Sequence, residues 1–293
     1  MKVVVAMDSF KGSLTSLAAG EAAREGILRA DPAAEVLVRP LADGGEGTVD
    51  CFVQAMGAQR VGVTVTNALG EKSTAAYARL GELAIIEMAA AAGLPQVGAL
   101  RCPGTATTYG VGELIAHAVD SGCRKILLGL GGSATNDGGC GCAAALGVRF
   151  TDAGGTSFVP VGATLDRIAH IDASAAHERL HGVRVIAMCD ITNPMHGHSG
   201  AACIFAPQKG ADSAAVDALE KNMEHYAAIV GDDIAACAGS GAAGGLGAAV
   251  RFYFGGELAP GFATLAPLIG LEEKICNADI VLTGEGCTDN QTN

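Results

Sequence analysis

Short apolar runs followed at once by polar, glycine-containing loops dominate the start of the chain. Residues 2–7 form such a run, rich in β-branched residues, and a helical pattern follows it through Ala30. A second run at 35–41 leads through a polar loop into a helical pattern that ends near Gly57. Apolar runs of this length predict buried strands, and their alternation with helices predicts a parallel sheet. We therefore expect two βα units in this part of the chain.

The pattern changes at Arg60. Segments 61–66, 74–80 and 83–88 follow one another across short polar turns, which predicts an antiparallel meander. The later chain alternates between helical and strand patterns, with helices expected at 110–120, 213–229 and 246–253 and strands at 125–130 and 183–188. This second region is therefore expected to be mixed α and β.

The last apolar run, at 278–284, resembles the opening units more than the middle of the chain. It predicts an α/β protein with a discontinuous, Rossmann-like parallel-sheet domain made of residues 1–60 plus 277–293. A second, mixed α/β domain at 61–276 would be inserted into it. A strand of this kind should be followed by a helix that packs on the sheet. Since the chain stops at Asn293, we also expect that the C-terminal part of the first domain is missing.

Composition narrows the class of protein. Glycine contributes 42 of 293 residues without a three-residue period, and 49% of residues are hydrophobic, which excludes collagen and disorder. No apolar run approaches the roughly 20 residues of a membrane span, so no membrane partner is expected. A net charge of −12 without a basic cluster argues against nucleic acid. The 10 scattered cysteines and the lack of a signal peptide favour the cytoplasm.

Four loops at strand ends combine small residues with carboxylates: 8–13, 43–48, 131–139 and 284–289. Ligands of open α/β sheets bind at the carboxyl ends of strands. Glycine lets backbone N–H groups approach an anion, and carboxylates beside it suit Mg²⁺ that accompanies a phosphate. The alternative is that these loops are tight turns with Asp and Ser as helix caps.

Nucleotide motifs give weaker signals. The Walker pattern is absent because the chain contains no Gly-Lys dipeptide. The dinucleotide pattern occurs at 129–134 and 239–244, but residues 136–139 delay the helix after the first, and the second lacks a preceding strand. A nicotinamide-dependent oxidoreductase therefore stays a minor alternative.

Single side chains add candidates for chemistry. Lys11 is the only lysine in the four loops and suits a transferring phosphoryl group. Asp190 follows the expected strand at 183–188 and suits a general base for a substrate hydroxyl, although a capping role fits it equally well. His196 and His198 would need a third ligand from elsewhere to bind a metal, and a polar turn explains them better.

Five blocks together resemble the signatures of the bacterial glycerate kinase family, of the glycerate 2-kinase type. They are MDSFKGSL at 7–14, ADGGEGT at 42–48, GGSATNDGG at 131–139, CDITNP at 189–194, and TGEG at 283–286 followed by DNQT at 289–292. The resemblance covers the whole chain in the same order. It implies ATP-dependent phosphorylation of D-glycerate at the 2-hydroxyl, to 2-phosphoglycerate, in a cleft between two domains. Two departures are that family members continue beyond these blocks, and that Cys287 stands where the family commonly has Arg.

The loops and the resemblance together suggest a set of roles. Lys11 and Asp190 are expected to be catalytic, Asp43, Glu46 and Glu285 to bind Mg²⁺, and Gly44, Gly45, Gly284 and Gly286 to bind the phosphates of ATP; Asp8, Ser9, Gly132, Ser133, Asn136, Asp137 and Asn193 are expected to bind D-glycerate. The rival hypothesis is a non-catalytic protein that binds a small carboxylate or a nucleotide. A homodimer stays open.

Overall fold

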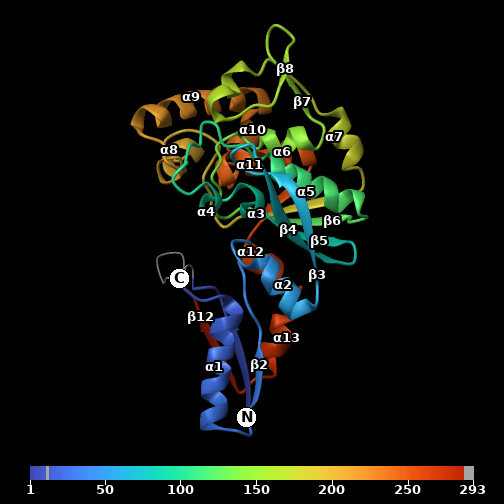
Figure 1. The fold of residues 1–293 in the computed structure, drawn as a ribbon, viewed down its shortest axis with the longest axis vertical. Helices are drawn as coiled ribbons and strands as arrows, with labels where there is room; N and C mark the ends of the chain where they lie inside the picture. The colour runs from blue at the N-terminus through green and yellow to red at the C-terminus, as the bar shows by residue number, and fades with distance from the viewer. Residues whose placement is uncertain (11–12, 287–293) are drawn as a thin grey trace.

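The computed structural model describes residues 1–10 and 13–286 and has an elongated shape (Figure 1). One end holds a parallel sheet in the order β12-β1-β2, made of Ile280–Gly284, Lys2–Met7 and Glu35–Val38. The last strand thus pairs with the first, Met7 opposite Gly284. The continuous apolar run of β1 is buried, as the sequence predicts for a central parallel strand.

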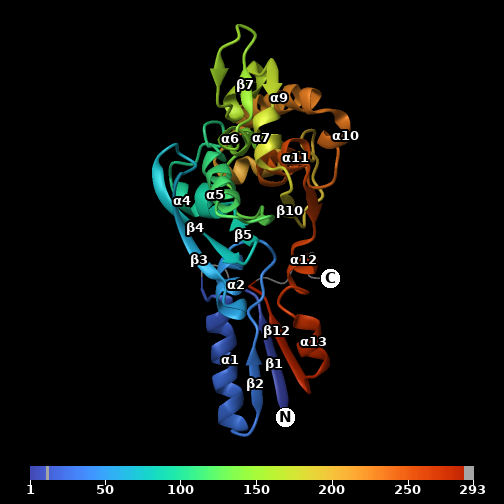
Figure 2. The ribbon, with the colours of Figure 1, turned by 90° about the vertical axis from the view of Figure 1, so that its right-hand side faces the viewer.

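Helices cover both sides of this small sheet. Helix α1 (Ser16–Ala30) begins at Thr15, whose hydroxyl accepts a hydrogen bond from the N–H of Ala18 at 3.1 Å. It packs on β1 and β2, while α13 (Leu271–Cys276) lies on the other side (Figure 2). The sheet is thereby held between two helical layers.

A second sheet has six strands in the order β11-β10-β6-β5-β4-β3. Its strands are β3 (Gln59–Thr66), β4 (Lys72–Leu80), β5 (Leu83–Glu87), β6 (Lys125–Gly129), β10 (Arg184–Met188) and β11 (Glu257–Ala259). Strands β3, β4 and β5 are antiparallel, which confirms the expected meander, whereas β5, β6, β10 and β11 are parallel. A third small sheet, β8-β7-β9 (Ser157–Phe158, Arg149–Thr151, His170–Asp172), was not expected from the sequence.

The remaining helices complete a mixed α/β fold of the predicted class. They are α2 (Thr48–Met56), α3 (Ala89–Ala92), α4 (Leu94–Val97), α5 (Tyr109–Asp120), α6 (Cys140–Ala145), α7 (Ser174–Arg179), α8 (Ala201–Phe205), α9 (Ser213–Val230), α10 (Asp232–Ala235), α11 (Ala242–Phe254) and α12 (Gly261–Leu265), with 3₁₀ turns η1 (Gly162–Arg167) and η2 (Pro207–Lys209). Within the described part of the chain, no helix has both the length and the apolar character that a membrane crossing requires.

Alternating residues of the central strands face two apolar cores. Ile126 and Leu128 of β6 belong to the core that also contains buried residues of α5, α6 and α11. Leu127, between them, belongs to a second core that includes Phe52 of α2 and Val4 of β1. Because this second core contains residues of both sheets, it joins the two ends of the molecule. Helix α2, which the sequence places in the first domain, packs on β4 and β5.

The parallel strands of the larger sheet end in line. Glu87 of β5 pairs with Gly129 of β6, which pairs with Met188 of β10, and Met188 pairs with Ala259 of β11. The loops that follow these strands therefore begin at one edge of the sheet. Loops in this position are where open α/β sheets bind ligands.

Candidate active site

The loop after β2 lies directly against this edge. A Cβ at Gly129 would collide with the carbonyl oxygen of Gly44. Gly44 has a φ of +91°, and a Cβ on it would lie 2.7 Å from the Cβ of Met188. Glycine at these two positions lets the backbones touch, and a positive φ favours glycine independently. The closeness of the loops is thus built into the sequence.

A cavity of about 360 Å³ opens where these loops meet. The predicted site residues on its wall are Asp43, Gly44, Gly45, Glu46, Gly132, Ser133 and Asp190. They come from the loops after β2, β6 and β10, so the structure brings together three of the segments that the sequence singled out. A second cavity, of about 270 Å³, is lined by Ser9, Glu46 and Glu87 among others, and Glu46 therefore borders both.

Asp190 is the carboxylate best placed for proton transfer. Its Oδ1 accepts a hydrogen bond from the N–H of Gly261 at 3.0 Å, at the start of α12. Partial burial raises the pKa of Asp190 above its usual value, and the negative charge of Asp43 adds to the increase. A carboxylate made more basic by its surroundings suits a general base.

Asp137 and Asn136 lie beneath the cavity wall instead of on it, and both are fully buried. The Asp137 carboxylate accepts hydrogen bonds from the N–H and hydroxyl of Thr108, each at 2.8 Å, and from the N–H groups of Gly139 and Gly141. Burial raises the pKa of Asp137. The two side-chain polar atoms of Asn136 have no hydrogen-bond partner among the described residues. Asp137 thus shapes the 131–139 loop from inside.

Lys209 is a site residue that the sequence did not reveal. It ends η2 and lines the cavity beside Ser133 and Gln208. The following residue, Gly210, has a φ of +98°, and a Cβ there would lie 2.7 Å from the Cβ of Arg101. No motif marks Lys209, because it lies outside the four carboxylate-containing loops.

The other predicted residues that the structure describes do not line this cavity. Asp8 donates its N–H to the carbonyl of Gly284 at 2.9 Å and accepts a hydrogen bond from the N–H of Ser9 at its Oδ1, which brings the loops after β1 and β12 together. The amide of Asn193 donates to the carbonyl of Ser199 at 2.8 Å. Glu285 and Gly286 are exposed, and Lys11 lies outside the described residues.

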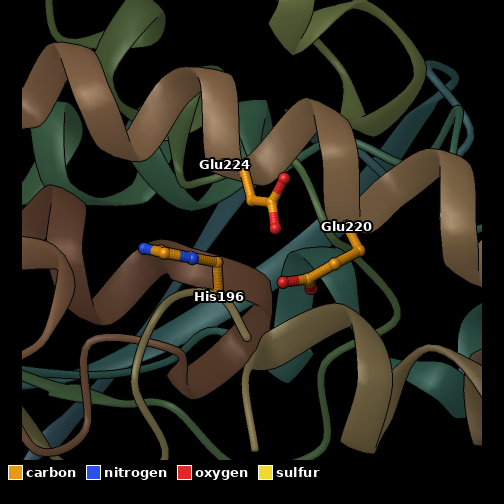
Figure 3. Close-up of side chains that lie close together, drawn as sticks. All are labelled: His196, Glu220 and Glu224. Carbon is orange, nitrogen blue, oxygen red and sulfur yellow. The ribbon is translucent and has the colours of Figure 1, made fainter. Parts of the chain in front are cut away.

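His196 has carboxylate neighbours on another part of the molecule. Glu220 and Glu224, one turn apart on α9, point toward the His196 ring, and the three ligand atoms lie within 4.8 Å of one another (Figure 3). The backbone N–H of Gly197 donates to Glu220. His198 is not in the group, and none of the three side chains lines the cavity described above. Exposed acidic groups such as Glu224 commonly cluster without a metal.

Comparison with known proteins shows a similarity over the full extent of the chain. Residues 3–293 match the sequence profile of the glycerate kinase family. The chain is 44% identical over 299 residues to a glycerate kinase from Bacillus cereus and 42% identical over 300 residues to the glycerate 2-kinase of Escherichia coli. In both comparisons 100% of this chain covers 78% of the relative.

A crystal structure shows the same fold. It is that of a Salmonella typhimurium LT2 protein assigned as glycerate kinase 2, with a TM-score of 0.91 and 43% sequence identity. The superposition covers 100% of this chain and 80% of the Salmonella chain.

Proposed function

The chain belongs to the glycerate kinase family, and we propose that it transfers the γ-phosphoryl group of ATP to the 2-hydroxyl of D-glycerate, giving 2-phosphoglycerate and ADP. One observation carries the proposal: Asp43, Glu46 and Asp190 converge on a single cavity with the glycine-rich 131–133 segment. Phosphoryl transfer depends mainly on positioning and on charge stabilisation, and these groups can supply both.

In this reaction Asp190 accepts the proton of the substrate hydroxyl while the hydroxyl oxygen bonds to the γ-phosphorus and ADP leaves. Asp43 and Glu46 would hold Mg²⁺, since carboxylate oxygens are the ligands that this ion prefers. When bound, the ion neutralises charge on the phosphate oxygens. Gly44 and Gly45, which line the cavity beside these carboxylates, would bind those oxygens. The assignments of Lys11, Glu285, Asp8, Ser9, Gly284, Gly286, Asn136, Asp137 and Asn193 stay predictions.

The proposed organisation places this chemistry between a Rossmann-like domain, residues 1–60 plus 277–293, and the inserted domain at 61–276. Strand β12 pairs with β1, which supports a first domain built from both ends of the chain. Helix α2 packs on β4 and β5, so it joins the first domain to the inserted one. The thiols are free in the described residues, which fits the proposed reducing cytoplasm.

The test is an incubation of the protein with ATP, Mg²⁺ and D-glycerate, with ADP release as the readout. Enolase acts directly on 2-phosphoglycerate, whereas 3-phosphoglycerate must first be converted to it by a mutase. Coupling the assay to enolase with and without the mutase therefore identifies which hydroxyl is phosphorylated. Chelation of Mg²⁺ should abolish turnover. Binding of glycerate without turnover would instead support the non-catalytic hypothesis, and hydride transfer to NAD without ATP use would support the oxidoreductase.

A further inference from the structure

Lys209 is a buried cation on the wall of the cavity. The residue is only 2% exposed, and its ammonium group donates to the hydroxyl oxygen of Ser133 at 2.8 Å and to the carbonyl oxygen of Thr135 at 2.6 Å. Lysine is almost never fully buried unless it is paired, because desolvation of the charge is costly. A buried lysine beside a cavity therefore needs a negative charge that compensates its own.

The charge of Lys209 is only partly compensated inside the protein. Lys209 has no ion pair among the described residues. The negative charge that acts on it is that of Asp137, whose oxygens already accept hydrogen bonds from three other residues. Burial lowers the pKa of Lys209 from 10.5 to about 7. The ammonium group is therefore under-compensated when the cavity holds no anion.

The charges around the cavity are unevenly distributed. Its described lining contains the carboxylates of Asp43, Glu46 and Asp190, and Lys209 is the single cationic side chain among these residues. An anionic substrate would be repelled by the three carboxylates unless its charged group lay against the cation. The place of lowest energy for that group is therefore beside Lys209.

We infer that Lys209 and Ser133 bind the carboxylate of the acceptor substrate and so orient its hydroxyl group for reaction. This inference rests on the proposed function and names the residues that recognise the acid. Two of the three ammonium protons of Lys209 are used on Ser133 and Thr135, which leaves one. Because the Ser133 oxygen accepts from Lys209, its own proton is free to point elsewhere. The pair thus offers two donors, which match the two oxygens of one carboxylate.

A phosphate of ATP fits this corner less well. A polyphosphate with its metal ion needs many donors and carboxylates close by, and the latter lie on the 43–46 loop. The corner at Lys209 is accordingly assigned to glycerate.

The test compares the wild-type chain with Lys209→Met, with Lys221→Met on the exposed side of α9 as the matched control. Loss of a hydrogen bond to a charged group should raise the KM for D-glycerate by about 10- to 100-fold. The KM for ATP should stay within about twofold, and Lys221→Met should behave as wild type. A raised KM for ATP with an unchanged KM for glycerate would overturn the assignment.

The uncharged amide of glyceric acid gives a readout that a merely structural role would not move. Wild type should prefer the acid over the amide, and Lys209→Met should lose that preference. If wild type and Lys209→Met prefer the acid over the amide to the same degree, Lys209 does not recognise the carboxylate. Thermal unfolding by circular dichroism establishes that the variant is folded.

Calorimetry on the wild-type chain and on Lys209→Met separates this inference from the proposed function. At pH 8, binding of D-glycerate should be accompanied by uptake of close to one proton. The negative charge of the bound carboxylate raises the pKa of Lys209 and so favours its protonated form. Uptake without turnover would refute the kinase but support the subsite. Turnover with an affinity for D-glycerate that Lys209→Met leaves unchanged would support the kinase and refute the subsite. No binding, with or without ATP, would refute both.

Discussion

Replacing Asp137 with Asn distinguishes a ligand of the substrate, which the sequence predicts, from an internal support of the 131–139 loop. The Oδ2 of Asp137 accepts hydrogen bonds from the N–H and hydroxyl of Thr108 at 2.8 Å each and from the N–H of Gly141 at 3.2 Å. Its Oδ1 accepts from the N–H of Gly139 at 3.1 Å. Since the side chain is fully buried, we expect the substitution to act on stability.

The magnitude follows from the hydrogen bonds that an amide cannot make. In its more favourable orientation, the side chain introduced by Asp137→Asn would direct its one carbonyl oxygen at Thr108 and its NH₂ group at the N–H of Gly139. Two buried donors, the new NH₂ group and the Gly139 N–H, would then face each other without an acceptor. Each such loss costs about 1–3 kcal/mol, so the free energy of unfolding should fall by about 2–6 kcal/mol. For a chain of 293 residues, that corresponds to roughly 3–10 °C in the unfolding midpoint.

Thermal unfolding followed by circular dichroism measures this effect, with Asp152→Asn as the matched control. The Asp152 carboxylate also accepts backbone hydrogen bonds, from Gly154 and Thr156 at 2.9 Å each, but lies at the surface, where water can replace them. The control should lose less than about 1 kcal/mol. A midpoint of Asp137→Asn equal to that of wild type, together with a raised KM for D-glycerate, would refute the reasoning and return Asp137 to the substrate.

Three further changes address the cavity and its charges. Asp190→Asn should lower kcat by about 10²- to 10⁴-fold with little change in the unfolding midpoint; a near-normal rate of ADP release would exclude a general base here. Gly129→Ala should lower activity, because the added methyl group would push the Gly44 loop away. The control Gly62→Ala, with nothing within 4 Å of its Cβ, should leave activity unchanged. Equal rates of the two variants would contradict the contact between Gly129 and Gly44. Because burial depresses the pKa of Lys209 to about 7 from 10.5, the unfolded state binds more protons between these values, so the stability of wild type relative to Lys209→Met should rise with pH from about 7 to 10 in urea titrations. A difference independent of pH would argue against a depressed pKa of Lys209 in the folded protein.

Strands were predictable where burial on both faces gives a continuous apolar run. The run at 2–7 and the run at 125–130 appear as β1 and β6 with nearly the predicted ends. Strands β7, β8 and β9 have only 2 or 3 residues each, too few for any periodicity to show. Their pairing is fixed by tertiary contacts, which a local pattern does not contain.

The start of α11 shows how backbone conformation modifies a pattern. The sequence predicts a helix from residue 246, and the helix is assigned from Ala242. However, Ala243, Gly244 and Gly245 have left-handed φ values of 52°, 68° and 97°, so regular helical geometry begins close to the predicted residue. Ala243 also lines the cavity, and a left-handed φ at a residue with a Cβ is typical of strained functional sites.

The site was predictable to the extent that its residues follow strands. Asp43 and Asp190 stand just beyond strand ends, and the alignment of those ends brings them to one cavity. The roles of Asp137 and Lys209 depend on partners distant in sequence, Thr108 and Ser133. The spacing of residues along the sequence does not encode such partners. The sequence therefore did not indicate that Asp137 is buried beneath its loop, whereas Lys209 lines the cavity.

Glycine is abundant in this chain partly because loops from the two sheets meet without intervening side chains. A Cβ at Gly261 would collide with the carbonyl of Asp43 and lie 3.0 Å from Oδ2 of Asp190, and a Cβ at Gly131 would lie 3.1 Å from the Cα of Gly45. These contacts fix the distance between a proposed metal ligand and the proposed general base. A methyl group there would move the two carboxylates relative to each other by displacing backbone. Because phosphoryl transfer depends on such positioning, these glycines should influence the rate although they carry no chemistry of their own.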